Sequence, residues 1–364
     1  MRIIFLLVVI VLMQAFTFGL GRSLQWLFAD FFNKAQRRWL MIAAYVVSNL
    51  LLLGVVFRVS HGIFRIAATW LVLMLFVMYA ALATFLLYLL LCRVLNAKPM
   101  ARSLRIFAPL FLIALLVMGL YNAYTPVVRH AEITLDKPLV KPVRIALASD
   151  THFGILFGAR QIDKLVDIVN REQADVVLLA GDVMDDNTDY YRSENMQPHL
   201  EKLRAPLGVY ATMGNHDLFG HQAEIDAELT KAGVRVLNDE AIELEQGFTI
   251  VGRLDDLDKQ RKTTTELLQK VDTTKPVILV DHRPSQIEKH SQLPIDVQVS
   301  GHTHNGQIMP ANLIVRYLNR LAYGYEHIGN GHFFVTSGYG FWGVPFRLGS
   351  QSEVWIIDIK GKQP

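Results

Sequence analysis

Residues 176–182 read Val-Val-Leu-Leu-Ala-Gly-Asp: five apolar residues are followed at once by a glycine and an acid. An apolar run of this length suits a β-strand that is buried on both faces, and the glycine allows a sharp turn beside the acid. Four other short apolar runs also end in polar side chains, at Asp150, Gly214-Asn215, Asp281-His282 and Gly301-His302. The sequence therefore predicts five strands whose carboxyl ends carry polar side chains.

Helical spacing of apolar residues separates some of these strands, at 159–173 and at 221–232. Shorter strands are expected at 234–237, 242–245 and 248–251. Strands that alternate with helices indicate an α/β domain, which we place at residues 143–364. Because sites in such sheets gather at the carboxyl ends of strands, we expect the polar clusters to converge.

The N-terminal third has a different pattern. Four apolar runs contain no Asp, Glu, Lys, Arg or His: Ile3–Leu20, Trp39–Phe57, Ile66–Cys92 and Ile106–Ala123. About 18 or more apolar residues in a helix can cross hydrocarbon about 30 Å thick. We expect a membrane domain at 1–123 with about four transmembrane helices, and a proline-containing linker at 124–142.

Charge is unevenly distributed along the chain. Residues 1–125 hold 11 of the 36 Lys and Arg residues and one acid, Asp30, whereas the remainder is acidic. The first and third segments between the apolar runs carry eight Lys and Arg residues, and the second carries two. The positive-inside rule then favours a multi-pass protein of the cell (inner) membrane with an extracytoplasmic C-terminal domain. Basic residues between apolar runs do not indicate nucleic-acid binding, and the single cysteine, Cys92, allows no intramolecular disulfide.

The five polar clusters contain carboxylates, an amide and several imidazoles. This mixture of donors suits divalent ions such as Mn²⁺, Fe²⁺ or Zn²⁺. The donors are too many for one ion, whereas two ions about 3.5–4 Å apart that share one carboxylate would use them all. We therefore expect two divalent metal ions. We expect the histidines outside the clusters, such as His290, to have structural roles.

The clusters in chain order also resemble the motifs of one known superfamily. They are Asp150-x-His152, Gly181-Asp182-x-x-Asp185, Gly214-Asn215-His216-Asp217, His282, and Gly301-His302-x-His304. Over roughly residues 143–357 this series resembles the calcineurin-like metallophosphoesterase superfamily, and the helices in front resemble its membrane-anchored subgroup. The resemblance implies an α/β metallophosphoesterase domain in which two mixed sheets form a sandwich flanked by helices.

The resemblance also implies a role for each motif residue. Asp150, His152 and His304 would bind the first metal, Asn215, His282 and His302 would bind the second, and Asp182 would bridge them. A metal-bound hydroxide would attack the phosphate. His216 would protonate the leaving oxygen, and Asp185 would orient His216.

Two features near these motifs qualify the resemblance. Protein Ser/Thr phosphatases of the superfamily have an arginine where this chain has Asp186, which argues against that branch. The aromatic, glycine-rich stretch 339–347 has two interpretations. It could be an irregular loop that closes the sandwich, or a lip where Arg347 contacts phosphate and the aromatic residues contact lipid.

We therefore expect a membrane-anchored, two-metal phosphoesterase that hydrolyses a phosphomonoester or phosphodiester. The anchor favours a lipid-linked substrate and contact with membrane lipids, although many anchored enzymes act on soluble molecules. The alternative is a membrane sensor or transport-associated protein with a regulatory metal-binding domain. The charge-free spans and the complete ligand set count against that alternative.

Overall fold

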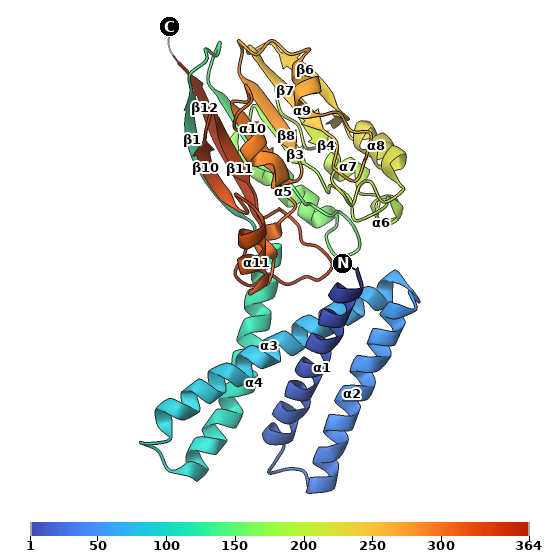
Figure 1. The fold of residues 1–364 in the computed structure, drawn as a ribbon, viewed down its shortest axis with the longest axis vertical. Helices are drawn as coiled ribbons and strands as arrows, with labels where there is room; N and C mark the ends of the chain where they lie inside the picture. The colour runs from blue at the N-terminus through green and yellow to red at the C-terminus, as the bar shows by residue number, and fades with distance from the viewer. Residues whose placement is uncertain (1, 363–364) are drawn as a thin grey trace. The chain divides into compact units, whose positions relative to one another are not determined.

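The chain divides into two compact units, with the boundary between Gly119 and Leu120. The computed structural model describes residues 2–362, and Figure 1 shows the first unit as helices and the second as a mixed α/β domain. This division confirms the expected order of fold classes along the chain.

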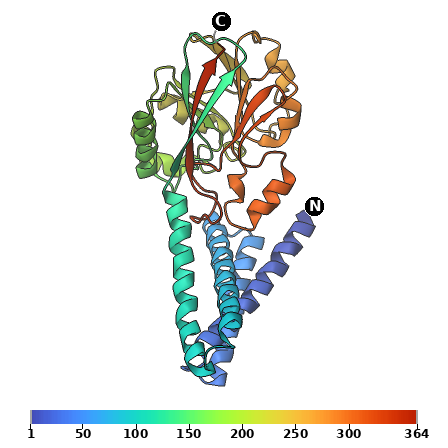
Figure 2. The same cartoon turned by 90° about the vertical axis from the view of Figure 1, so that its left-hand side faces the viewer.

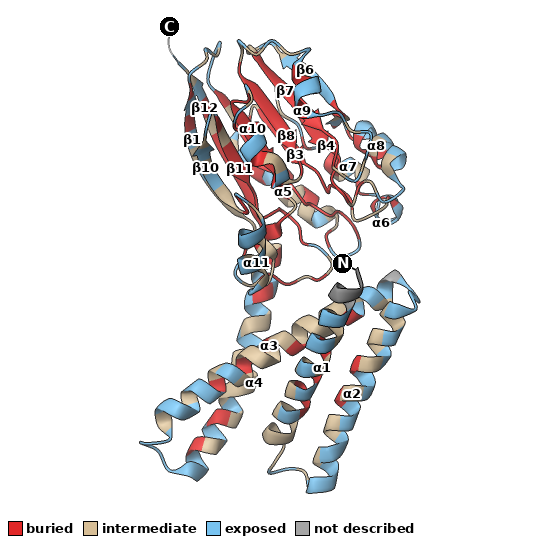
Figure 3. Cartoon of the chain, in the orientation of Figure 1, coloured by how far each residue is buried: buried red, intermediate tan, exposed pale blue. Residues whose placement is uncertain are grey.

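The first unit consists of long apolar helices. They are α1 (Arg2–Leu27), α2 (Lys34–Val56), α3 (His61–Leu91) and α4 (Ala97–Tyr124). All four are long and apolar enough to cross a membrane. Many of their large apolar side chains are exposed, among them Leu50, Leu90 and Val117. Figure 3 shows exposed and intermediate residues along most of each helix. A helix that is apolar all round is typical of a membrane span.

Local signals explain where two of these helices begin. Asn33 and Gln36 form a reciprocal pair at the start of α2, in which each side chain accepts a hydrogen bond from the other residue's backbone N–H. Ser60 caps α3 by accepting from the N–H of Ile63. Such caps satisfy N–H groups that lack partners within the helix.

The second unit contains two six-stranded sheets. The order of strands in the first sheet is β1 (Val127–Leu135), β12 (Glu353–Gly361), β2 (Val143–Ala148), β3 (Val176–Ala180), β4 (Val209–Thr212) and β5 (Arg235–Val236). The order in the second is β10 (Gly324–Ile328), β11 (Gly331–Val335), β9 (Val297–Ser300), β8 (Val277–Asp281), β7 (Phe248–Arg253) and β6 (Glu240–Leu244).

The two sheets pack face to face, and helices lie outside them (Figure 2). The core between the sheets includes Ile145 and Leu178 from one sheet and Ile278 and Val299 from the other. The outer helices are α5 (Ala159–Glu172), α6 (Asp189–Ser193), α7 (Gln197–Leu200), α8 (Gln222–Lys231), α9 (Thr264–Leu268), α10 (Ile287–His290) and α11 (Ala311–Leu318). The predicted sandwich flanked by helices is therefore confirmed.

The segment expected to be a linker is instead largely a strand. Residues 127–135 form β1, which pairs in parallel with β12 along its whole length. Ile133 and Leu135 face the core, while His130 and Glu132 are exposed, so the strand has the alternation of an edge strand. Only Thr125 and Pro126 separate α4 from β1, and the last turn of α4 belongs to the second unit.

Strand direction explains how the site residues come together. Strands β2, β3, β4 and β5 are parallel neighbours, and so are β7, β8 and β9. The carboxyl ends of β2, β3 and β4 therefore lie at one edge of the first sheet, and those of β8 and β9 at one edge of the second. These are the strands that precede the polar clusters.

His290, one of the histidines expected to be structural, is fully buried. Its ring nitrogens are each 2.8 Å from a side-chain oxygen, Oγ1 of Thr264 and Oε1 of Gln298. Burial lowers the pKa of His290 from 6.5 to about 4. The unfolded chain therefore takes up a proton near pH 6.5, whereas the folded chain takes it up only near pH 4.

We expect this difference to reduce stability as the pH falls from about 6.5 to about 4. The drop in melting temperature between pH 7.5 and pH 5.0 should be smaller in His290→Gln than in the wild type, measured for both in the same detergent. Acid release of bound metal affects both proteins alike. An equal drop in the two proteins would contradict the structural interpretation of His290.

Candidate metal centre

The strand ends bring six of the predicted ligands into two groups. One group is Asp150, His152 and His304, and the other is Asp182, His282 and His302. Within each group, one potential ligand atom per residue lies within 4.8 Å of the others. Five of the six residues are buried, and His302 is partly buried. The spacing and burial are those of sites that could each hold a metal ion.

Asp182 lies between the two groups. Its Oδ2 atom is 3.1 Å from Nε2 of His282 and 3.9 Å from Nε2 of His152. Its Oδ1 atom accepts a hydrogen bond of 2.8 Å from the backbone N–H of His216. One oxygen is therefore fixed by the backbone, and the other faces both groups of ligands.

Hydrogen bonds also orient other members of the groups. Nδ1 of His282 donates to the carbonyl of Ala180 at 2.7 Å, so Nε2 is the ring nitrogen that faces the site. Asp150 accepts hydrogen bonds from Oγ of Ser149 at 2.6 Å and from the backbone N–H of His302 at 3.0 Å. These partners hold each donor atom in one direction.

Several buried nitrogen and oxygen atoms of the site, each of a type that can bind a metal, have no hydrogen-bond partner among the described residues. They are both ring nitrogens of His152, Nε2 of His282 and Oδ1 of Asn215. A buried polar atom without a partner costs roughly 1–3 kcal/mol. Metal ions bound by these atoms would remove that cost, so the donor set fits divalent cations. The position of the Asn215 amide adds a seventh potential ligand to the six grouped residues.

Burial keeps most of the imidazoles neutral. It lowers the pKa of His152 and of His302 from 6.5 to about 3, and that of His304 falls well below 6.5 for the same reason. Burial also raises the pKa of Asp150 to about 6. Metals bind to neutral imidazoles. Neutral imidazoles do not compensate the negative charge of the buried carboxylates, so bound cations would stabilise these carboxylates.

The backbone of the ligand-bearing loops is strained. Asp150, His152, Asp182, His302 and His304 all have φ angles between 43° and 69°, the left-handed region. For residues other than glycine this conformation costs roughly 1–2 kcal/mol each. Strain of this kind concentrates at functional sites, where the surrounding structure stabilises it.

Two glycines allow close approach to the carboxylates. A Cβ atom on Gly214 would lie 2.1 Å from Oδ1 of Asp182, and one on Gly301 would lie 2.2 Å from Oδ2 of Asp150. Both distances are far shorter than a real contact. The glycine in each motif is therefore required by the neighbouring ligand.

An acid next to the predicted one contacts His216. Oδ1 of Asp186 lies 2.5 Å from Nδ1 of His216, whereas Oδ1 of Asp185 lies 4.0 Å from Nδ1 of His152. The backbone of Asp186 is left-handed, with φ at 68°, which makes successive side chains diverge. Asp186 is therefore a second acid, beside the predicted Asp185, that is placed to orient His216.

Asp186 also affects the charge of His216. Burial works against protonation of this imidazole, but the hydrogen bond to Asp186 and the negative charge of Asp182 outweigh it and raise its pKa above 6.5. His216 is therefore the imidazole of this region that is partly accessible and inclined to carry a proton, as a general acid requires.

Asp217 belongs to the motif Gly214-Asn215-His216-Asp217, but the sequence analysis assigned it no role. Its carboxylate is fully buried and accepts backbone N–H groups from Val183, Met184 and Gly214 at 2.9–3.2 Å. It therefore joins the loop that carries Asp182 to the loop that carries Asn215 and His216. In the sequence, only its position next to Asn215 and His216 pointed to a role for Asp217.

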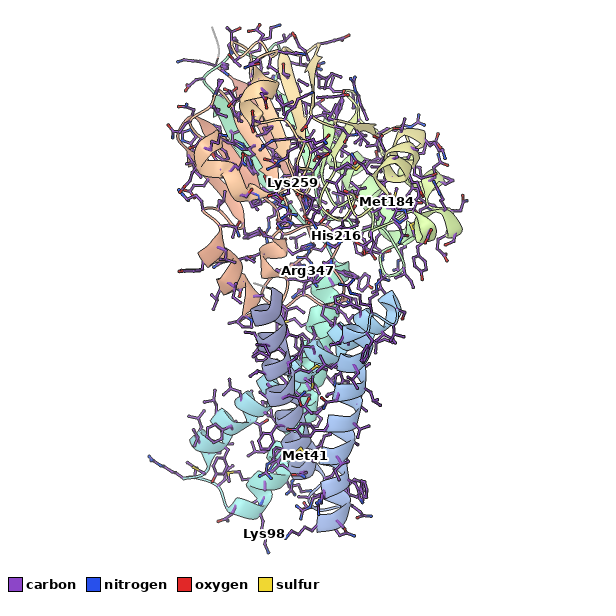
Figure 4. The ribbon with its side chains drawn as sticks, turned by 45° about the vertical axis from the view of Figure 1, so that its right-hand side comes forward. Met41, Lys98, Met184, His216, Lys259 and Arg347 are labelled. Atoms are coloured by element: carbon purple, nitrogen blue, oxygen red, sulfur yellow. The ribbon has the colours of Figure 1, made fainter. Side chains whose placement is uncertain are left out.

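Arg347 faces the interior and not a substrate. Its side chain is fully buried and donates to the carbonyls of Ser337 and Gly340 at 2.7 and 2.5 Å. Another contact, 3.2 Å, reaches Nδ1 of His304. The predicted contact between Arg347 and phosphate is therefore wrong, because the guanidinium group is committed to these buried partners. Figure 4 shows Arg347 and His216 at the same end of the domain.

Comparison with known proteins agrees with this geometry. The model of the family "Calcineurin-like phosphoesterase" matches residues 143–306. An "Uncharacterized metallophosphoesterase" of Helicobacter pylori strain J99 is 33% identical over 73% of this chain and 72% of its own length. The chain belongs to the calcineurin-like metallophosphoesterase family. It is thus a metal-dependent phosphoesterase by family.

Other metallophosphoesterases show similar matches. A protein of the same description from Aquifex aeolicus is 33% identical over 60% of this chain and 86% of its own length. A "Transmembrane protein with metallophosphoesterase domain" of Danio rerio is 29% identical over 68% of this chain and 60% of its own length. The family therefore includes members that are named for both a membrane part and this domain.

We predict that Gly301→Ala lowers the metal content of the purified metallophosphoesterase, because the new Cβ would displace Asp150 and Ser149. The control is Gly158→Ala, where φ is −106° and a Cβ atom would meet Cε of Met196 at an ordinary contact distance of 3.4 Å. Metal content per chain, measured by mass spectrometry, should fall only in Gly301→Ala. Equal content in the two variants would show that this glycine is not needed for the ligand geometry.

Proposed function

We propose that the protein hydrolyses a phosphomonoester or phosphodiester with two divalent ions. Asp150, His152 and His304 hold one ion, Asn215, His282 and His302 hold the other, and Asp182 is shared. The observation that carries the proposal is the position of Asp182 Oδ2 between the two groups. Two such ions would neutralise the phosphate oxygens and lower the pKa of the attacking water.

In this proposal His216 is the acid that donates a proton to the leaving oxygen. Its Nδ1 is occupied by Asp186, so Nε2 is the nitrogen that donates. Its ring lies 4.9 Å from the ring of His152, which places the acid beside the ligands. Asp186 acts as a positioning residue, since it fixes the ring and favours the protonated form.

The leaving group provides the test. The activity to measure is the hydrolysis that EDTA abolishes and added Mn²⁺ restores. We expect His216→Ala to slow an alkyl phosphate by about 10²–10⁴-fold, the usual value of general acid catalysis, because an alkoxide needs the proton. A p-nitrophenyl phosphate should be affected little, since p-nitrophenolate leaves without one.

The neighbouring acid supplies a second variant. Asp186→Asn should show the same dependence on the leaving group in a milder form, because its carboxylate lies against Nδ1 of His216. Equal slowing of both substrates by His216→Ala would identify His216 as a ligand or a phosphate contact. Activity that survives exhaustive removal of metal would rule out the two-ion proposal itself.

We further propose that the four helices anchor the enzyme in the cell (inner) membrane with the catalytic domain outside the cytoplasm. Support comes from the eight Lys and Arg residues in the first and third connecting segments against two in the second. An alkaline phosphatase fused to the C-terminus should be active, because this reporter needs an oxidising exterior. If a reporter that fluoresces only in the cytoplasm is bright when fused to the C-terminus, the catalytic domain lies in the cytoplasm and the proposed topology is wrong.

A further inference from the structure

Helix α11 has an apolar face that no described part of the protein covers. None of its residues is buried. Leu313 and Ile314 are each 57% exposed, Leu318 is 71% exposed, and Tyr317 is 90% exposed. This spacing places the four side chains along one side of the helix, where a helix of a soluble domain would normally pack on the core.

The exposed apolar surface continues beyond α11. The side-chain amide of Gln307, just before the helix, accepts from the backbone N–H of Trp342 at 2.9 Å and donates to its carbonyl at 3.0 Å. The Trp342 and Leu156 side chains are also exposed. We call the set of exposed apolar residues here the apolar rim: Leu156, Leu313, Ile314, Tyr317, Leu318 and Trp342.

Hydrogen bonds connect this rim to the last turn of α4. The hydroxyl of Tyr124 donates to the carbonyl of Leu156 at 3.0 Å. Asn122 donates to the carbonyl of Arg347 at 3.2 Å, and the carbonyl of the next residue, Leu348, accepts from Met309 just before α11 at 2.7 Å. Figure 1 shows α11 at the end of the domain where the chain enters it from α4.

The length of α4 indicates where the membrane surface must lie. Arg105 is its last charged residue, and the apolar stretch begins at Ile106. About 20 residues, at about 1.5 Å each, cross about 30 Å of hydrocarbon, so the stretch ends near Tyr124. Tyr121 and Tyr124 are of the residue type that gathers at the lipid headgroups.

These same residues are part of the catalytic domain. Ala123 is fully buried in its core, and the ring of Tyr124 lies 5.3 Å from that of Phe341. The domain surface around Tyr124 therefore meets the headgroup region. The apolar rim adjoins this surface, because Tyr124 is hydrogen-bonded to the rim residue Leu156. A lipid bilayer is the partner whose chemistry and position fit the rim.

We propose that the apolar rim docks into the headgroup region of the membrane that α4 crosses, and thereby holds the catalytic centre at the level of lipid phosphates. The ring of Trp342 lies 6.1 Å from that of His216, so rim and centre adjoin. The substrate class that follows is a phosphate ester carried by a membrane lipid. This last step rests on the proposed function, whereas the docking itself does not.

Fluorescence quenching tests the docking directly. Cys92 is the only cysteine, so Cys92→Ala gives a background for single labels. Leu318→Cys, labelled with bimane in proteoliposomes of phosphatidylcholine and phosphatidylglycerol, should be quenched by lipids with a nitroxide at the headgroup. The matched control is Glu245→Cys, an exposed residue in the turn before β7, at the edge opposite the carboxyl ends of the parallel strands.

We expect the lipid nitroxide to quench the label at position 318 at least about twofold more than the label at 245, while soluble iodide quenches the label at 245 more. Strong quenching of position 318 by iodide alone would show a face in water and overturn the proposal. Protection of position 318 from both quenchers would show a protein cover, such as a second copy of this chain, and would also overturn it.

A pair of substrates tests the substrate class separately. Ethyl and hexadecyl p-nitrophenyl phosphate share the same bond and leaving group, but only the second partitions into vesicles. The quadruple variant Leu313→Ser, Ile314→Ser, Tyr317→Ser and Leu318→Ser should keep its rate on the ethyl ester and lose at least about fivefold on the hexadecyl ester. Equal losses on both would contradict a lipid-borne substrate.

The two kinds of failure can be distinguished. Loss of docking appears in the quenching data whether or not the protein is active. A wild-type protein that hydrolyses neither diester, and no p-nitrophenyl phosphate monoester, would instead contradict the proposed function. Activity on the monoester alone, with position 318 quenched by lipid, would support docking and restrict the substrates to lipid monoesters.

Discussion

The catalytic domain is organised around two carboxylates that are almost completely buried. Asp150 is fully buried and Asp182 nearly so, and three of the surrounding imidazoles are kept neutral by burial. Buried negative charge is expensive unless hydrogen bonds and cations compensate it. Backbone N–H groups and a serine hydroxyl supply part of that compensation. The left-handed loops and the close-approach glycines are stable because they complete this arrangement.

The sequence was informative where chemistry depends on strand ends. A buried apolar run fixes where a parallel strand stops, so the positions of Asp150, Asp182 and His302 followed from local pattern. The sequence was less informative where the backbone conformation of a single residue decides a contact. Asp185 and Asp186 are neighbours, and the left-handed backbone of Asp186 turns its carboxylate toward His216. Strand β1 was missed because its prolines flank it and its apolar residues alternate at an edge.

The distribution of arginines has a further meaning for catalysis. Arg347 is committed to backbone carbonyls, and Arg283, which follows His282, is paired with Asp255 and Asp256. An acid, Asp186, occupies the place where protein phosphatases of the superfamily have an arginine. Charge neutralisation of a bound phosphate would then fall on the metal ions and on His216. With such a division of roles, the site would depend strongly on its cations.

The pairing of β1 with β12 has a consequence for how the protein is made. β1 emerges from the ribosome directly after the last apolar helix, but its partner β12 is the last strand among the described residues to be synthesised. β12 also lies between β1 and β2, so the first sheet stays open along its middle until that strand arrives. In the nascent chain, β1 therefore has no pairing partner until almost the whole domain has been translated. Premature termination at any point before β12 would leave two exposed strand edges, a form that cellular proteases readily recognise.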